Sequence, residues 1–276
     1  MTITVTLLGT GSPLPDPDRA GPSTLVQAGP ANLLVDAGRG CVMRLAGAGL
    51  FPSMVTGVLL THLHSDHICA LNDVVTSHWV TSPVPSVLPI HGPVGTASVV
   101  AGIEQMLSAD VGYRLDHHDD LEAGPQLEVV EHGPGEAFEL GGCTVTTHAT
   151  DHRPVEPTLG YRIEHEGTVA AIAGDTVPCP GLDELCAGAD LYVQTVIRSD
   201  LVALVPSARL QDILDYHSTV EQAAQTAARA GVGTLVLTHY VPPLQRGAED
   251  EWRAIAAQHF DGDVVLGDDL TRAGAD

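Results

Sequence analysis

The chain is organised around one heptapeptide, Thr61-His62-Leu63-His64-Ser65-Asp66-His67. It follows the apolar run 55–60, which is typical of a buried β-strand. Histidine and carboxylate are ligand types that zinc commonly uses, and this stretch holds far more of them than a stable loop requires. Alternate residues of an extended chain point the same way, so His62 and His64 can converge on one metal ion. A turn after them lets Asp66 and His67 reach a second ion. We therefore predict a metal site at the end of this strand, where open α/β sheets usually bind their ligands.

Composition limits the fold and the partners. A chain of 276 residues with 44% hydrophobic residues can bury a large core, and no linker-like segment divides it, so we expect one domain spanning 1–276. All 12 basic residues are arginine, against 35 acidic residues, which gives a net charge of −23. Proteins that bind large nucleic acids usually carry basic patches. The charge therefore disfavours a large RNA partner.

The chain carries no sequence signal for secretion or for a membrane. Its five cysteines are odd in number and form no CxxC pair, which is typical of unpaired thiols in a reducing compartment. The first residues alternate threonine with apolar side chains and predict a strand, not a signal peptide. No apolar run reaches the roughly 18 residues of a membrane span. We expect a cytoplasmic protein without a membrane partner.

Strands dominate the predicted elements, and helices gather in few places. This pattern predicts an α/β protein with two sheets packed face to face and helices outside. Within the polar segment 108–137, the cluster 116–120 (Asp-His-His-Asp-Asp) could be a second metal site, but a solvated acidic loop is favoured because no apolar strand delivers it into a cleft. Strands are predicted at 2–8, 32–36, 55–60, 87–91, 127–130, 143–149, 159–163, 169–173, 190–196 and 234–238, and helices at 40–48, 72–80, 95–107, within 209–230 and within 250–260.

Three further apolar strands end in residues of ligand type. Asp151-His152 follows the strand at 143–150, Asp175 follows 169–173, and His239 follows 234–237. One such aspartate would be weak evidence, because a carboxylate at a strand end often caps a helix. Four strand ends of this kind in one chain favour a site for two metal ions. The Gly-rich turn 9–13 could also face an anion through its backbone N–H groups, but it is weak evidence alone.

The pattern His-x-His-x-Asp-His after a strand, followed by distant His, Asp and His, resembles the metallo-β-lactamase superfamily, and its ribonuclease Z branch most closely. The resemblance covers essentially the whole chain. It implies a four-layer αββα sandwich and a metal-dependent hydrolase. The matching segments are 8–12 (LGTGS), 33–38 (LLVDAG), 61–68 (THLHSDHI), 89–93 (PIHGP), 160–163 (GYRI), 174–176 (GDT), 217–219 (HST) and 238–240 (THY).

The resemblance also implies roles for single residues. Two Zn²⁺ ions are expected, with manganese or iron as substitutes, and a hydroxide between them would attack a phosphodiester. Asp66 would also orient that hydroxide, and His217, before an expected capping box Ser218-x-x-Glu221, would protonate the leaving oxygen. His148 is a rival third ligand, but His152 is favoured because Gly160-Tyr161 follows it as in the family. The implied ligands are His62, His64 and His152 for one ion, Asp66, His67 and His239 for the other, and Asp175 as the bridge.

Two departures from the family bear on the substrate. Ribonuclease Z enzymes carry a long arm that grips transfer RNA, whereas only 162–173 lie between the two corresponding strands here. Their His-Glu-Ala-Thr segment, whose glutamate steadies the leaving-group histidine, corresponds to 194–197 (Gln-Thr-Val-Ile), so Thr195 replaces the carboxylate and His217 should be held less firmly. Both departures disfavour tRNA. A small or short phosphodiester is the first expectation, with RNA 3′-end cleavage close behind and a homodimer expected from the family.

Two other functions remain open at this point. The same hydroxide could attack the carbonyl of a lactone, ester or thioester in small-molecule metabolism. A redox di-iron protein on the same fold is the second alternative. Such proteins usually have a carboxylate at the position of His64, so this histidine favours zinc and hydrolysis.

Overall fold

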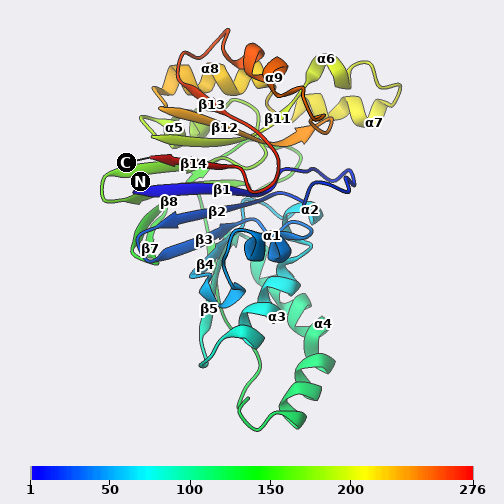
Figure 1. Ribbon diagram of the computed structural model, residues 1–276, viewed down its shortest axis with the longest axis vertical. Helices are drawn as coiled ribbons and strands as arrows, with labels where there is room; N and C mark the ends of the chain where they lie inside the picture. The colour runs from blue at the N-terminus through cyan, green and yellow to red at the C-terminus, as the bar shows by residue number, and fades with distance from the viewer. Residues whose placement is uncertain (1, 276) are drawn as a thin grey trace.

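The computed structural model describes residues 2–275, and its first half builds one mixed sheet with helices on its outer face (Figure 1). β14, the last strand of the chain, completes this sheet by pairing antiparallel with β1, so the strand order is β14-β1-β2-β3-β4-β5-β6. These elements are β1 (Ile3–Gly9), β2 (Ser23–Ala28), β3 (Ala31–Val35), α1 (Cys41–Gly47), η1 (Pro52–Met54), β4 (Gly57–Leu59), α2 (Ser65–Ile68), α3 (Leu71–Thr81), β5 (Val87–Pro93), α4 (Thr96–His117), β6 (Gln126–His132) and β14 (Arg272–Ala275).

The second half builds a second sheet with the strand order β13-β12-β11-β10-β9-β8-β7. Helices α5, α8 and α9 cover its outer face, on the side opposite to the first sheet (Figure 1). The elements are β7 (Ala137–Leu140), β8 (Cys143–Ala149), β9 (Leu159–His165), β10 (Thr168–Ile172), α5 (Pro180–Cys186), β11 (Leu191–Ile197), α6 (Ser199–Val202), α7 (Ala208–Gln211), η2 (Asp212–Asp215), α8 (Val220–Ala230), β12 (Thr234–Val241), α9 (Glu249–Ala256) and β13 (Asp263–Val265).

Three hydrophobic clusters hold the layers together. One lies between the two sheets, and the others lie between each sheet and its helices. Strands covered on both faces should be continuously apolar rather than alternating. Every residue of β4, β10 and β11 is buried, and these strands are apolar except for Thr168, Gln194 and Thr195. The predicted αββα sandwich is therefore confirmed.

Several element predictions were incomplete. The structure adds β2, β7, β13 and β14, and it extends the helix predicted at 95–107 to His117. Asp116 and His117 are thus the end of α4 rather than a loop, and all five residues of the 116–120 cluster are exposed. The helix continues because Leu107, Val111 and Leu115 recur every four residues and keep one side of α4 partly buried.

The capping box before α8 lies one residue later than predicted. Thr219, not Ser218, accepts a hydrogen bond from the backbone N–H of Gln222, and the Gln222 side chain accepts one from the Thr219 backbone. The hydroxyl of Ser218 is unavailable as a cap because it is buried and donates to the Thr176 carbonyl at 2.7 Å. The shift leaves His217 immediately before a doubly anchored turn.

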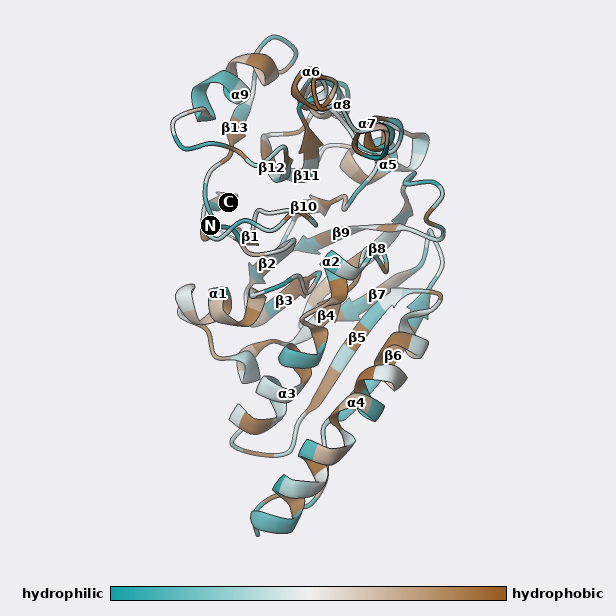
Figure 2. Cartoon of the chain, turned by 90° about the vertical axis from the view of Figure 1, so that its right-hand side faces the viewer, coloured by the Kyte–Doolittle hydropathy of each residue, from teal (hydrophilic) through white to brown (hydrophobic). Residues whose placement is uncertain are grey.

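The cysteines of the chain form no disulfide in the structure. All five cysteines are free, and three of them are buried. The longest helix of the described residues, α4, mixes hydrophilic and hydrophobic residues along its length (Figure 2). Between residues 2 and 275, no helix is both long enough and apolar enough to cross a membrane.

Candidate metal centre

Turns at the ends of β4, β8 and β10, with the irregular end of β12, bring the predicted ligands together. The histidines and carboxylates come from segments far apart in the sequence, the first being His62 and the last His239. Their ligand atoms form three overlapping groups, within each of which all atoms lie within 4.8 Å of one another. The groups are His62, His64, His152 and Asp175; Asp66, His67 and His239; and Asp175, His217 and His239.

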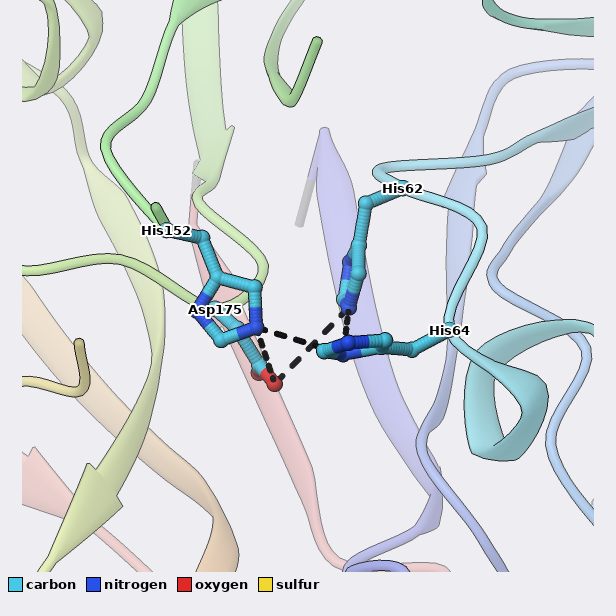
Figure 3. A group of neighbouring side chains, drawn as sticks. All are labelled: His62, His64, His152 and Asp175. Atoms are coloured by element: carbon cyan, nitrogen blue, oxygen red, sulfur yellow. Dashed lines mark hydrogen bonds and ion pairs between the residues drawn. The ribbon is translucent and has the colours of Figure 1, made fainter. Parts of the chain in front are cut away.

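The first group surrounds a point that a metal ion can occupy. Figure 3 shows the four side chains pointing toward one another. His64 Nδ1 lies 3.1 Å from His62 Nε2 and 3.3 Å from His152 Nε2, and Asp175 Oδ2 lies 3.9 and 3.8 Å from the same two Nε2 atoms. Nitrogens bound to one tetrahedral zinc ion at about 2.0–2.1 Å stand roughly 3.3 Å apart. The spacing of this group therefore fits zinc coordination.

The second group, Asp66, His67 and His239, lies beside the first, and Asp175 of the first group also faces it. The Oδ2 atom of Asp175 lies 3.4 Å from His67 Nε2 and 3.6 Å from His239 Nε2, while Asp66 Oδ2 lies 3.7 and 3.4 Å from those nitrogens. His67 Nε2 and Asp175 Oδ1 are buried and have no hydrogen-bond partner. Unpartnered buried polar atoms are costly, and here they face a set of donors suited to a divalent cation. The residues present therefore fit a second ion.

Asp36 is a residue of this centre that the sequence analysis did not assign. Its carboxylate accepts a hydrogen bond from His67 Nδ1 at 2.7 Å, and from the backbone and hydroxyl of Thr61 at 2.8 Å each. A carboxylate on Nδ1 leaves Nε2 of His67 free to face a metal ion. Asp36 also follows an apolar strand, β3, so the rule that identified the other strand ends would have selected it.

Backbone carbonyls of one segment orient two other histidines. His152 Nδ1 lies 2.9 Å from the Tyr216 carbonyl, and His217 Nδ1 lies 3.0 Å from the Ile213 carbonyl. A carbonyl oxygen only accepts, so both Nδ1 atoms carry hydrogen and both Nε2 atoms face the centre. Ile213 and Tyr216 belong to the segment of α7 and η2 that lies over the site. Neither residue had been predicted to contribute, since backbone carbonyls leave no sequence signal.

Burial and charge act in opposite directions on the ionisable groups. Burial lowers the pKa of His62 well below its ordinary value, with a further contribution from His67. For His67, burial would lower the pKa, but the carboxylates of Asp175 and Asp36 outweigh it and raise the pKa well above the ordinary value. For Asp175, burial would raise the pKa, yet His239 and His67 hold it well below the ordinary range. The centre thus contains an ionised carboxylate among imidazoles.

Two details of the backbone explain the motifs around the ligands. Gly174 has a φ of +67°, and a Cβ there would stand 2.7 Å from Cβ of Thr61, so the Gly-Asp turn needs glycine to pack against the first turn. His239 was predicted to follow its strand but lies inside β12, with a φ of +53°. The pairing of β11 with β12 shifts register there, which turns His239 out of the regular pleat toward the centre.

The remaining predictions have mixed outcomes. In the Gly-rich turn, the N–H groups of Thr10 and Gly11 bond Asp269 and Ala20, so an anion role for these two groups is wrong. The hydroxyl of Thr195 donates to the Gly174 carbonyl at 3.0 Å. Whether its substitution for glutamate loosens His217 stays a prediction.

The rival ligand His148 takes no part in any of the three groups. Its Nδ1 lies 3.9 Å from Glu184 Oε2, on the half-buried strand β8. His152, by contrast, is fully buried within the first group. The geometry favours His152.

An apolar cavity of about 140 Å³ adjoins the metal centre. Asp66, Asp175, His217 and His239 reach its wall from the centre. The rest of the wall is mainly apolar and includes Leu14, Leu210, Ile213 and Val241. A reacting group at the centre would therefore have a hydrophobic surface beside it.

Comparison with known proteins agrees with the fold and the centre. The model of the β-lactamase superfamily domain matches residues 31–240. Ribonuclease Z of Mycobacterium avium (strain 104) is 57% identical over 276 residues, and 99% of each chain is covered. Ribonuclease Z of Mycobacterium tuberculosis (strain H37Rv) is 53% identical over 270 residues, which cover 97% of this chain and 96% of that one.

Solved structures share the same fold at low sequence identity. The metallo-β-lactamase fold protein YhfI of Bacillus subtilis has a TM-score of 0.72 at 24% identity, and the short form of human tRNase Z has 0.71 at 23%. Each comparison covers 98% of both chains. The chain therefore belongs to the β-lactamase superfamily, groups with its ribonuclease Z members, and is a metal-dependent hydrolase.

Proposed function

We propose that this chain is a ribonuclease Z-like phosphodiesterase that cleaves RNA at a centre of two zinc ions. The observation that carries the proposal is the convergence of ring nitrogens and carboxylate oxygens at spacings of 3.1–3.9 Å, with buried atoms left unpartnered. The proposed ligands are His62, His64 and His152 for one ion, Asp66, His67 and His239 for the other, and Asp175 for both.

Two divalent ions, when bound, would supply an activated water and neutralise charge on the scissile phosphate. The chain's own side chains position the reacting groups. Asp66, buried beside His67 and His239, can accept a hydrogen bond from an attacking water and so orient it. The carbonyl of Ile213 fixes the hydrogen on His217 Nδ1, so proton transfer by His217 takes place at Nε2. We therefore assign His217 the protonation of the leaving oxygen.

A short or unstructured RNA end fits this chain better than a folded tRNA. β9 and β10 are joined only by Glu166 and Gly167, so this position carries a plain hairpin without a gripping arm. The net charge of −23 also opposes extended contact with a phosphate backbone. The relatives named ribonuclease Z support RNA as the substrate class, and they do so at 53–57% identity.

The experiment is turnover by zinc-loaded protein on three substrates: bis-p-nitrophenyl phosphate, a short single-stranded RNA and a panel of lactones. We expect hydrolysis of the first two, and loss of both activities after chelation with recovery on addition of zinc. Asp175→Asn and the exposed control Asp261→Asn separate loss of the centre from a general effect. Turnover confined to lactones would contradict the proposal.

A hydrolase of lactones, esters or thioesters is the second candidate. The apolar cavity beside the centre favours it, because Leu14, Leu210 and Val241 could hold an acyl chain next to His217. Leu210→Asn places a polar group in that wall. It should impair turnover of long-chain lactones if this candidate is right, and leave cleavage of bis-p-nitrophenyl phosphate little changed.

A further inference from the structure

A second, larger cavity opens next to the metal centre. Its volume is about 450 Å³, within the range of about 300–1,000 Å³ typical of ligand sites, whereas the apolar cavity of about 140 Å³ lies below it. The two cavities share His64 and Tyr216. A substrate bound at the centre can therefore extend into the larger one. The polar and aromatic residues of its wall are His64, Arg153, Arg209, Asp212, Asp215 and Tyr216.

Arg209 is the cation of this cavity that is free to bind a ligand. Arg153 already donates to both oxygens of Asp151 through Nε and Nη2. Among the described residues, Arg209 has neither an ion pair nor a side-chain hydrogen bond, and it is exposed on α7. Most other arginines of this chain are paired with carboxylates. A guanidinium of this kind presents a planar set of donors that matches a phosphate group.

Tyr216 provides an aromatic surface between the cavity and the centre. Its half-buried ring lies 5.2 Å from the His152 ring and 4.8 Å from the His217 ring. Nucleobases stack on aromatic side chains of this kind, and replacing such a side chain by alanine weakens binding. A base stacked on Tyr216 would lie within one nucleotide of the scissile bond.

The cavity is of mixed charge, because the exposed carboxylates of Asp212 and Asp215 face it beside the arginines. A simple inorganic anion would meet repulsion from these carboxylates. A nucleotide carries both kinds of group, since its phosphate can bind a guanidinium and the amino groups of its base can donate to a carboxylate. The lining therefore fits a nucleotide better than an isolated phosphate.

We propose that this cavity binds the nucleotide next to the scissile phosphate, with Arg209 on its further phosphate and Tyr216 against its base. The proposal rests on the proposed phosphodiesterase function and names its substrate class: oligonucleotides of at least two phosphates, in preference to small diesters. Arg209 and Tyr216 then determine specificity without taking part in bond cleavage.

The test compares zinc-loaded wild type and Arg209→Gln on a tetranucleotide RNA and on bis-p-nitrophenyl phosphate. The small diester has no base and no second phosphate. We expect Arg209→Gln to lower kcat/KM on the RNA about tenfold, mainly through KM, and to leave the diester within about twofold. Arg114→Gln, a matched change on the remote part of α4, should affect neither substrate. Equal kinetics of Arg209→Gln and wild type on RNA, or an equal loss on both substrates, would overturn the proposal.

Binding provides a readout that does not depend on turnover. In the His217→Ala background, the affinity for the fluorescently labelled tetranucleotide is measured by anisotropy. Adding Arg209→Gln or Tyr216→Ala should weaken it about tenfold, while Tyr216→Phe keeps the ring and the affinity. If Arg209→Gln and Tyr216→Ala both leave the affinity unchanged, the proposed nucleotide-binding role of the cavity is contradicted, even if the wild type cleaves RNA. Absent cleavage by wild type with normal RNA binding would instead count against the proposed function alone.

Discussion

At the scale of single residues, His217 is the side chain whose loss should separate chemistry from metal binding. Its Nε2 lies 3.3 Å from Asp175 Oδ2, and its other nitrogen is held by a carbonyl, so it can deliver a proton without being needed as a ligand. We expect His217→Ala to lower kcat by about 10²–10⁴-fold while the bound zinc stays the same. Steady-state kinetics and elemental analysis of the variant check this, with the exposed His259→Ala as control. A parallel loss of zinc would show that His217 is a ligand.

Asp36 should act through His67. The carboxylate of Asp36 holds the hydrogen on His67 Nδ1. The backbone of Asp36 has a φ of +60°, a strained conformation that the three hydrogen bonds of its carboxylate stabilise. Asp36→Asn keeps the size but no longer provides the charge, so zinc affinity should fall by about 10–100-fold. Competition with a chelator measures that affinity. Asp73→Asn, on the exposed side of α3, is the control, and equal affinities of wild type and Asp36→Asn would rule out this positioning role.

At the scale of elements, the turn before α8 ties the centre to a helix. Thr219 and Gln222 form the capping box of α8, which begins two residues after His217. Replacing such a cap by alanine costs about 1 kcal/mol, so Thr219→Ala should lower the free energy of unfolding by that amount. Urea denaturation measures the change. Ser207→Ala, before the short α7, forms no side-chain cap and should leave the stability unchanged.

A pH-dependent contact joins the edges of the two sheets. His91 of β5 is 2.9 Å from His132 of β6, which is 2.8 Å from Glu136, and Phe138 of β7 stacks on both rings. Burial, with a smaller contribution from His132, lowers the pKa of His91 from 6.5 to about 4. The neutral form is therefore favoured in the folded state. The contribution of neutral His91 to the stability of the folded protein is complete above pH 6.5 and is lost as the pH falls toward 4.

Metal-free protein should accordingly lose stability between pH 6.5 and 4, by at most about 3 kcal/mol from this group. His91→Asn keeps a hydrogen-bonding group near the Nδ1 position but does not titrate. Its unfolding free energy should change less over this interval than that of the wild type. Identical pH profiles of the two proteins would contradict the account.

Some elements could be predicted from the sequence and others could not. β10 was predictable because the run from Val169 to Ala173 is apolar, and the proposed ligands could be selected because each stands at or near the end of a predicted strand. β14 was missed, since four residues with little hydrophobic character pair only because β1 offers an open edge. The Ile213 and Tyr216 carbonyls were missed because any residue could supply them.

At the scale of the whole molecule, the core between the sheets draws on both halves of the chain. Leu33 and Leu59 of the first sheet pack in one cluster with Ile163 and Val193 of the second. We therefore predict a single domain that unfolds in one cooperative transition, with coincident far-ultraviolet circular dichroism and tryptophan fluorescence curves. Two separated transitions would show that the halves fold independently. A homodimer and a cytoplasmic location stay predictions.

The central claim is that seven side chains hold two metal ions, and the zinc content of purified, zinc-reconstituted protein tests it most directly. We expect two ions per chain for the wild type, about one for His152→Ala, and two for His148→Ala, whose side chain lies outside the ligand groups. Inductively coupled plasma mass spectrometry gives these numbers. A wild type without stoichiometric metal, or loss of an ion on replacing His148 but not His152, would contradict the claim.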